Sequence, residues 1–121
     1  MAADKIGNKR LVVGAHYGLR DWLAQRLTAV LMAVYAIVFG SYAVFLLPPG
    51  YDAWAGVFAP LGMKVATLVV MLALLYHAWV GMREIFMDYL KPTWVRLVAY
   101  TITLLWLAVC AVWAVQILWR V

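Results

Sequence analysis

The stretch MKVATLVVMLALLYHAWVGM at residues 63–82 decides the fold, because nearly all of its side chains are apolar over the length of a membrane span. About 20 such residues in an α-helix cross the hydrocarbon core of a bilayer. Comparable stretches lie on either side of it, at about 27–47 and 97–119, and the middle helix is expected to continue to residue 90. The sequence therefore predicts an all-α membrane protein with three transmembrane helices.

The composition excludes a water-soluble domain. Of the 121 residues, 69% are hydrophobic and 12% are charged, whereas a soluble domain averages about half apolar and about a quarter charged residues. The net charge of +5 does not indicate nucleic acid, because the cations flank the apolar stretches and form no basic face. They are expected to set the topology and contact lipid headgroups. Cys110, the only cysteine, excludes an intrachain disulfide and a cysteine metal cluster.

The segments outside the three spans are short, and we expect one membrane-anchor domain over residues 1–121. Residues 1–26 are expected to form a cytoplasmic arm, in which 16–25 make a short amphipathic helix in the membrane interface. Prolines end the first two spans, in Pro48-Pro49-Gly50 and in Lys91-Pro92. Because apolar residues occupy nearly every face of the three helices, some faces must contact lipid or other subunits.

The uneven placement of lysine and arginine orients the spans. All of them except Lys64 and Arg120 lie before or at the start of the first span, or around the second connection. The positive-inside rule then places the N-terminus and the second connection in the cytoplasm. The C-terminus is expected on the opposite side of the membrane.

His77 is the strongest functional signal, since ionisable groups at membrane depth are rare and usually mark a site. It shares one face of the middle helix with Gly81, Glu84 and Asp88, at spacings of four, three and four residues. Eleven residues separate it from Asp88, which is roughly 16 Å along a helix and places it near the bilayer midplane. Two interpretations are open: a hydrogen bond to a neighbouring carbonyl, or axial ligation of a haem b iron.

Gly81 and the number of histidines bear on the haem interpretation. Gly81 lies one turn from His77 without a side chain, so it either leaves room for a flat group or allows close helix packing. The only other histidine, His16, precedes the first span and is not expected to reach a midplane iron. A bis-histidine haem would therefore take its second ligand from another polypeptide.

Asp88 and Tyr89 lie where the middle helix meets the predicted cytoplasmic interface. A tyrosine hydroxyl there can donate a hydrogen bond to a quinone carbonyl, and a neighbouring carboxylate can tune that tyrosine or relay protons. Interfacial tyrosines are also common as aromatic-belt residues, and an acid beside one is commonly just solvated. Both interpretations stay open, and the nearby Arg83 and Glu84 are assigned no role.

The stretch HAWVGMREIFMDYLKP at residues 77–92 resembles the signature of the hydrophobic membrane anchor subunit of bacterial succinate dehydrogenase. The entry to the first span, RDW at 20–22 and RLTA at 26–29, is similar to that family too. Together with the length, spans and orientation, the resemblance covers nearly the whole chain. It implies that His77 is an axial ligand of the haem b iron, that Tyr89 contacts ubiquinone, that Asp88 belongs to the quinone pocket and that Arg26 lies near the haem propionates.

The implied function is that of a non-catalytic anchor subunit in respiratory complex II, in the inner (cytoplasmic) membrane of a bacterium. The implied partners are a second membrane-anchor (cytochrome b) subunit that shares the haem, an iron–sulfur subunit and a flavoprotein subunit, so that the spans join a larger hetero-oligomeric helix bundle. Electrons from succinate oxidation would pass to ubiquinone at the anchor. The alternatives are a fumarate reductase anchor, a small proton-coupled transporter that uses Glu84 or Asp88, and a purely structural scaffold.

Overall fold

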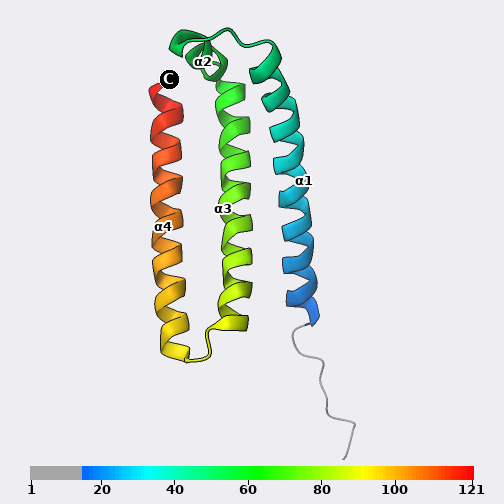
Figure 1. The fold of residues 1–121 in the computed structure, drawn as a ribbon, viewed down its shortest axis with the longest axis vertical. Helices are drawn as coiled ribbons and strands as arrows, with labels where there is room; N and C mark the ends of the chain where they lie inside the picture. Colours follow the sequence, from blue (N-terminus) through cyan, green and yellow to red (C-terminus); the bar gives the residue numbers. More distant parts are fainter. Residues whose placement is uncertain (1–14) are drawn as a thin grey trace, which may run out of the picture.

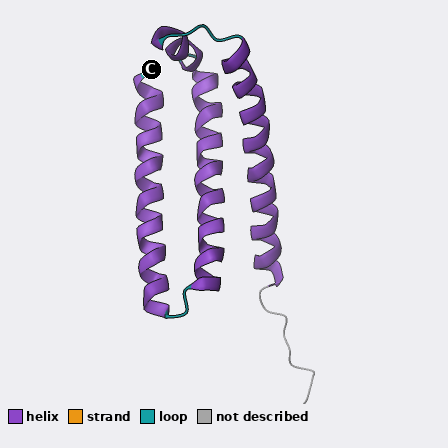
Figure 2. Cartoon of the chain, in the orientation of Figure 1, coloured by secondary structure: helices purple, strands orange, loops and turns teal. Residues whose placement is uncertain are grey.

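The computed structural model describes residues 15–121, with side chains from residue 18 onward, and these residues form four helices and no strand. The order is α1 (Ala15–Phe45), α2 (Tyr51–Phe58), α3 (Leu61–Tyr89) and α4 (Thr93–Arg120), as Figures 1 and 2 show. Three of the helices are apolar over 28, 29 and 28 residues, beginning at Gly18, Leu61 and Thr93. Each is about 42 Å long at 1.5 Å per residue, which is enough to span a membrane. The predicted all-α fold with three transmembrane helices is confirmed.

The three long helices lie side by side in a single layer, with α3 between α1 and α4 and the short α2 across one end (Figure 1). Both outer helices pack on α3. The turns that join the helices contain the predicted breakers. Gly50 has a φ of +122°, a conformation that glycine adopts without steric strain, and Pro92 immediately precedes α4. Pro60, which was not among the predicted breakers, immediately precedes α3.

The structure differs from the expected organisation at two places. Residues 16–25 do not form a separate interfacial helix, because α1 runs unbroken from Ala15 to Phe45 and no proline interrupts it. The connection before α3, which was expected only to be short, contains the helix α2. Two aromatic side chains of α2 explain its position, since Trp54 and Phe58 pack against Phe39 of α1 at centroid distances of 6.0 and 5.5 Å.

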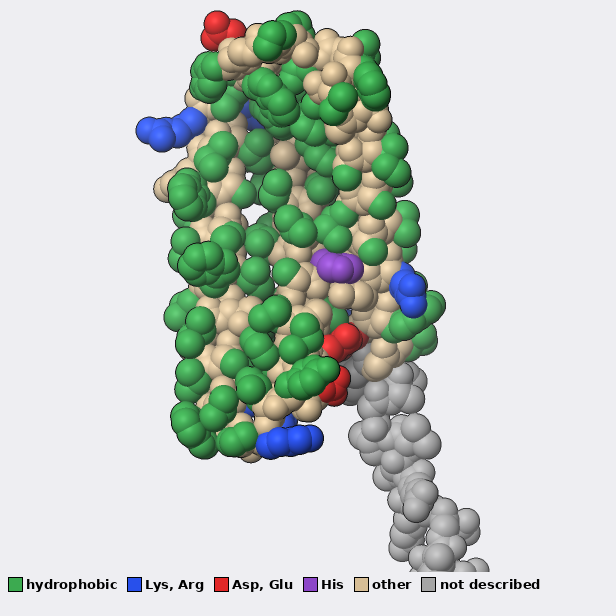
Figure 3. Space-filling model, viewed as in Figure 1, with side chains coloured by type: hydrophobic (Ala, Val, Ile, Leu, Met, Phe, Trp, Pro, Cys, Tyr) green, Lys and Arg blue, Asp and Glu red, His purple; other side chains and the backbone are tan. Residues whose placement is uncertain are grey.

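Few side chains are buried within this layer. Among the described residues, those with less than a tenth of their surface exposed are Thr67, Ala73, Val80 and Leu118. Hydrophobic side chains cover most of the face seen in Figure 3, and most charged side chains lie toward the ends of the helices. A surface of this kind is stable only against lipid or other apolar helices, which fits one part of a larger helix bundle.

Polar and aromatic contacts hold the layer together at separate levels. The Tyr35 hydroxyl of α1 lies 2.8 Å from the Thr67 hydroxyl of α3, so the buried threonine has a hydrogen-bond partner. On the other side of α3, Trp79 and Phe86 pack against Tyr100 of α4 at centroid distances of 5.7 and 5.9 Å. These contacts fix the rotation of α3 relative to both neighbours, and this rotation decides where its functional side chains point.

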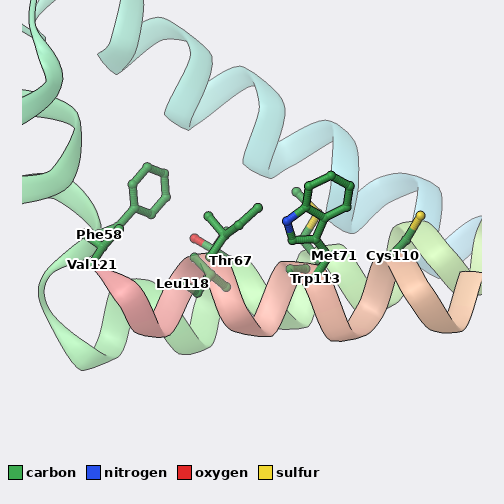
Figure 4. A pocket seen from close by; sticks show the side chains of 9 residues that line it. Phe58, Thr67, Met71, Cys110, Trp113, Leu118 and Val121 are labelled. Atoms are coloured by element: carbon green, nitrogen blue, oxygen red, sulfur yellow. The ribbon is translucent and has the colours of Figure 1, made fainter.

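A largely apolar cavity of about 370 Å³ lies between α3 and α4 at the end covered by α2. Figure 4 shows Phe58, Thr67, Met71 and Trp113 around it. Cys110 is the only titratable side chain in its lining. This cavity therefore lacks the charged groups that would bind a polar cofactor or take part in a reaction. The ionisable side chains line a different cavity, between α1 and α3.

Candidate functional site

His77 lies on the face of α3 that packs against α1, and its side chain is half-buried. The Nδ1 atom of its ring is 3.0 Å from the Thr28 hydroxyl oxygen. The Nε2 atom is 3.4 Å from Nε2 of Gln25. Both ring nitrogens thus have polar neighbours on the first helix, one turn apart. The structure has a side chain, not a backbone carbonyl, as the hydrogen-bond partner of the imidazole.

A cavity of about 610 Å³ opens beside His77, between α1 and α3. Its lining contains more ionisable groups than the apolar cavity near α2: Asp21, Arg26, His77, Arg83 and Glu84. Gln25 also lines it, and the carbonyl oxygen of its side-chain amide is buried without a hydrogen-bond partner in the described part of the chain. A buried amide oxygen of this kind is costly, which indicates that the arrangement around it is completed by another group.

Gly81 does not leave open space in this conformation. A Cβ atom added at Gly81 would lie 3.7 Å from Nε2 of Gln25, which is an ordinary van der Waals contact. The Gln25 amide therefore covers the turn of α3 that follows His77. The group next to Gly81 is thus a side chain, at a distance that would also accommodate an alanine.

Arg26 is exposed, and its guanidinium carbon stands 5.4 Å from the centroid of the Trp22 ring, one turn earlier on α1. Stacking of this kind orients a cation over an aromatic face. Arg26 also lines the cavity together with His77. The structure thus brings together two of the four residues singled out from the sequence, an imidazole and a cation on opposite helices.

An ion pair that the sequence did not predict lies nearer the end of the same contact. The Arg83 guanidinium of α3 donates to the Asp21 carboxylate of α1. The two side chains are 30% and 27% exposed, so the pair is neither fully solvated nor fully buried. The sequence indication of this pair was the presence of opposite charges at the ends of the two predicted helices that lie on the same side of the membrane. The pairing gives Arg83 a partner on α1.

Asp88 and Tyr89 stand apart from the cavity, at the last turn of α3. Both side chains are exposed, and Tyr89 has 78% of its surface accessible. The structure therefore separates them from His77 by three helical turns, roughly 16 Å along the axis. Among the described residues they form an open surface.

No three His, Cys, Asp or Glu side chains come together as a metal site among the described residues. The side chain of His16 lies outside the part of the chain that is described. The described residues therefore supply no three-donor set around His77, and a metal held by it would take further ligands from outside that set. A porphyrin and a second polypeptide are one combination that supplies them.

Comparisons with known proteins agree with these features. The family described as succinate dehydrogenase/fumarate reductase transmembrane subunit matches residues 3–117. A similar protein from Coxiella burnetii (strain RSA 493 / Nine Mile phase I), named succinate dehydrogenase hydrophobic membrane anchor subunit, is 41% identical over 102 residues, covering 84% of this chain and 89% of that protein. The resemblance drawn from residues 77–92 is thereby confirmed. The chain belongs to the family of succinate dehydrogenase and fumarate reductase transmembrane subunits.

Proposed function

We propose that this succinate dehydrogenase membrane anchor subunit contributes His77 as one axial ligand of a haem b and Tyr89 to a ubiquinone site. The observation that carries the haem proposal is the position of the His77 ring. Nδ1 is hydrogen-bonded to Thr28, and Nε2 faces only a side-chain amide that can turn away. A ligating histidine typically has this pattern, with one nitrogen for the metal and the other held by a hydrogen bond.

The surroundings of His77 fit a haem. The cavity beside the ring has about 610 Å³ and is lined by an exposed arginine, Arg26, that suits a propionate carboxylate. Haem b, when bound, would supply a centre that accepts and gives up one electron. This chain's residues would hold it from one side only, because the second axial ligand must come from another subunit.

Tyr89 and Asp88 support the ubiquinone proposal through their exposure at the end of α3. The Tyr89 hydroxyl is free to donate a hydrogen bond to a quinone carbonyl, which grows stronger as negative charge develops on that oxygen during reduction. The neighbouring carboxylate of Asp88 can orient the hydroxyl or accept a proton from water. Because both side chains are exposed, the rest of the pocket would come from the second anchor subunit and the iron–sulfur subunit.

The distribution of charge supports an orientation in the bacterial inner membrane. Within the described residues, the end of the bundle with Arg20, Arg83, Lys91 and Arg96 carries most of the cations. The positive-inside rule puts this end, with Asp88 and Tyr89, in the cytoplasm. The iron–sulfur and flavoprotein subunits would then dock on the same side, close to the proposed quinone site.

Replacement of His77 tests the haem proposal. His77→Leu should remove the haem or change its absorption spectrum strongly in the purified complex, measured together with the ratio of haem to flavin. Tyr76→Leu is the matched control, because Tyr76 is the preceding residue on α3 and is 42% exposed. A His77→Leu complex with the spectrum and haem content of the unmodified complex would show that His77 is not a ligand.

The family match also bears on the alternatives. Its description covers fumarate reductases, which share the architecture, whereas the Coxiella burnetii relative is named as a succinate dehydrogenase anchor. The ratio of succinate oxidation to fumarate reduction by the purified complex distinguishes these two directions. A homo-oligomeric, haem-free transporter would instead purify colourless and without partner subunits.

A further inference from the structure

The Thr28 hydroxyl has one hydrogen and several polar neighbours, which fixes what it can do toward His77. Its oxygen lies 2.8 Å from the carbonyl oxygen of Ala24 and 3.1 Å from that of Gln25, both on the preceding turn of α1. A carbonyl oxygen can only accept, and the Thr28 hydroxyl donates its hydrogen toward these carbonyls, as a threonine inside a helix commonly does. Its lone pairs are then left for the third neighbour, Nδ1 of His77, at 3.0 Å.

The direction of the Thr28 hydrogen bond indicates which ring nitrogen of His77 carries the hydrogen. Since the Thr28 oxygen accepts at Nδ1, the hydrogen of the neutral ring is on Nδ1 and the lone pair is on Nε2. The contact on the other side of the ring agrees. Nε2 of Gln25 is an amide donor, and it lies 3.4 Å from Nε2 of His77, where an acceptor is required. The orientation of the Gln25 amide is thus compatible with the tautomer that Thr28 favours.

We infer that Thr28 is a positioning residue, which holds His77 in the Nδ1–H tautomer and presents Nε2 as the iron-binding atom. This inference rests on the proposed haem ligation and extends it to a residue on the first helix. It also assigns a role to the Gln25 amide. The Gln25 amide lies against Nε2 of His77 and would have to turn away for an iron to bind there.

The hydrogen bond should also tune the iron. An acceptor at Nδ1–H makes the imidazole more basic, because it draws the hydrogen away from the ring. A more basic ligand stabilises the ferric form more than the ferrous form, and hydrogen bonding to the ligand is one of the means by which a protein sets the potential of a haem. Without the acceptor, the reduction potential should become more positive and the haem should be held less tightly.

The test compares Thr28→Val with Thr28→Ser in the purified, fully assembled complex. Valine has nearly the shape of threonine but no hydroxyl, whereas serine keeps the hydroxyl. The measurements are a redox titration of the haem absorption and the haem content after detergent washing. Thr28→Val should shift the midpoint potential in the positive direction and weaken haem retention, on the order of 10- to 100-fold for loss of a hydrogen bond to a metal ligand. Thr28→Ser should retain the original values.

Thr101 on α4 offers a matched control. Its hydroxyl also donates to the carbonyl oxygen four residues earlier, that of Leu97, at 2.9 Å, and its side chain is exposed. Thr101→Val removes the same intrahelical hydrogen bond and should leave the potential unchanged. Should Thr28→Val fail to assemble, Thr28→Ala replaces it, because alanine also lacks the hydroxyl and favours a helix.

The outcomes separate the inference from the proposal beneath it. If His77→Leu retains an unchanged haem, the ligation itself is wrong. If His77→Leu loses the haem but Thr28→Val keeps the original potential and haem retention, only the role of Thr28 is overturned. Equal shifts in Thr28→Val and Thr28→Ser would also overturn it, because the change would then follow packing and not the hydroxyl.

Discussion

Replacing Tyr89 with phenylalanine removes one hydroxyl from the end of α3 and should slow quinone reduction alone. The side chain is 78% exposed, so the change disturbs little packing within the chain. The loss is that of one hydrogen bond to the quinone, about 0.5–1.5 kcal/mol. At 1.36 kcal/mol for each factor of ten, kcat/KM for ubiquinone should fall about 2- to 13-fold.

The assay compares two electron acceptors on the same preparation. Succinate oxidation is followed with ubiquinone and then with an artificial dye that takes electrons before they reach the anchor. Tyr51→Phe is the matched control, because Tyr51 is 76% exposed and precedes α3 at the opposite end of the layer. Tyr89→Phe should lower the ubiquinone rate and leave the dye rate unchanged. Equal ubiquinone rates in the two variants would refute the role of Tyr89 in the quinone site.

The hydrogen bond between Tyr35 and Thr67, at 2.8 Å, should couple α1 to α3. In a double-mutant cycle of Tyr35→Phe and Thr67→Val, the free energies of unfolding should depart from additivity by about 0.6 kcal/mol and at most about 1.7 kcal/mol, and additive values would show that the contact contributes nothing. Gly81→Ala should be tolerated, because the added Cβ would lie 3.7 Å from the Gln25 amide. Gly81→Leu should instead push Gln25 into the cavity and lower the haem content, and a full haem complement in that variant would show that the haem lies elsewhere.

The spans were predictable because their apolar stretches are long and are bounded by proline and glycine. The rotation of each helix relative to its neighbours could not be predicted. Apolar side chains on nearly every face give no indication of which face of α1 meets α3. In a membrane, an apolar face can lie equally well against lipid or against another helix. The helical spacing of His77, Gly81 and Glu84 identified the face of α3 that meets α1 and lines the cavity, but the contacting residues on α1 needed the structure.

The sequence contained one indication of the contact with His77, the polar residues Gln25 and Thr28 of the first helix. They are polar residues three apart on one face of the first helix, at the level where the apolar span begins. A threonine in a helix can satisfy its hydroxyl on its own backbone, so its type alone does not predict a contact with His77. The roles of Asp88 and Tyr89 stay predictions for a different reason, because both side chains are exposed at the last turn of α3 and their surroundings there do not reveal a ligand.

A single layer of three helices has a consequence for assembly. α3 contacts both neighbours and carries His77, Asp88 and Tyr89, yet α1 alone covers His77, and the cavity beside it remains open along one face. If the proposed haem and the proposed second anchor subunit both bind at this open face, each would add to the surface that the other binds. Ligands that bind only the assembled state stabilise it by mass action. Haem insertion and pairing of the two proposed anchors should therefore be thermodynamically coupled. In this chain, the coupling would depend on His77 and on its hydrogen bond with Thr28.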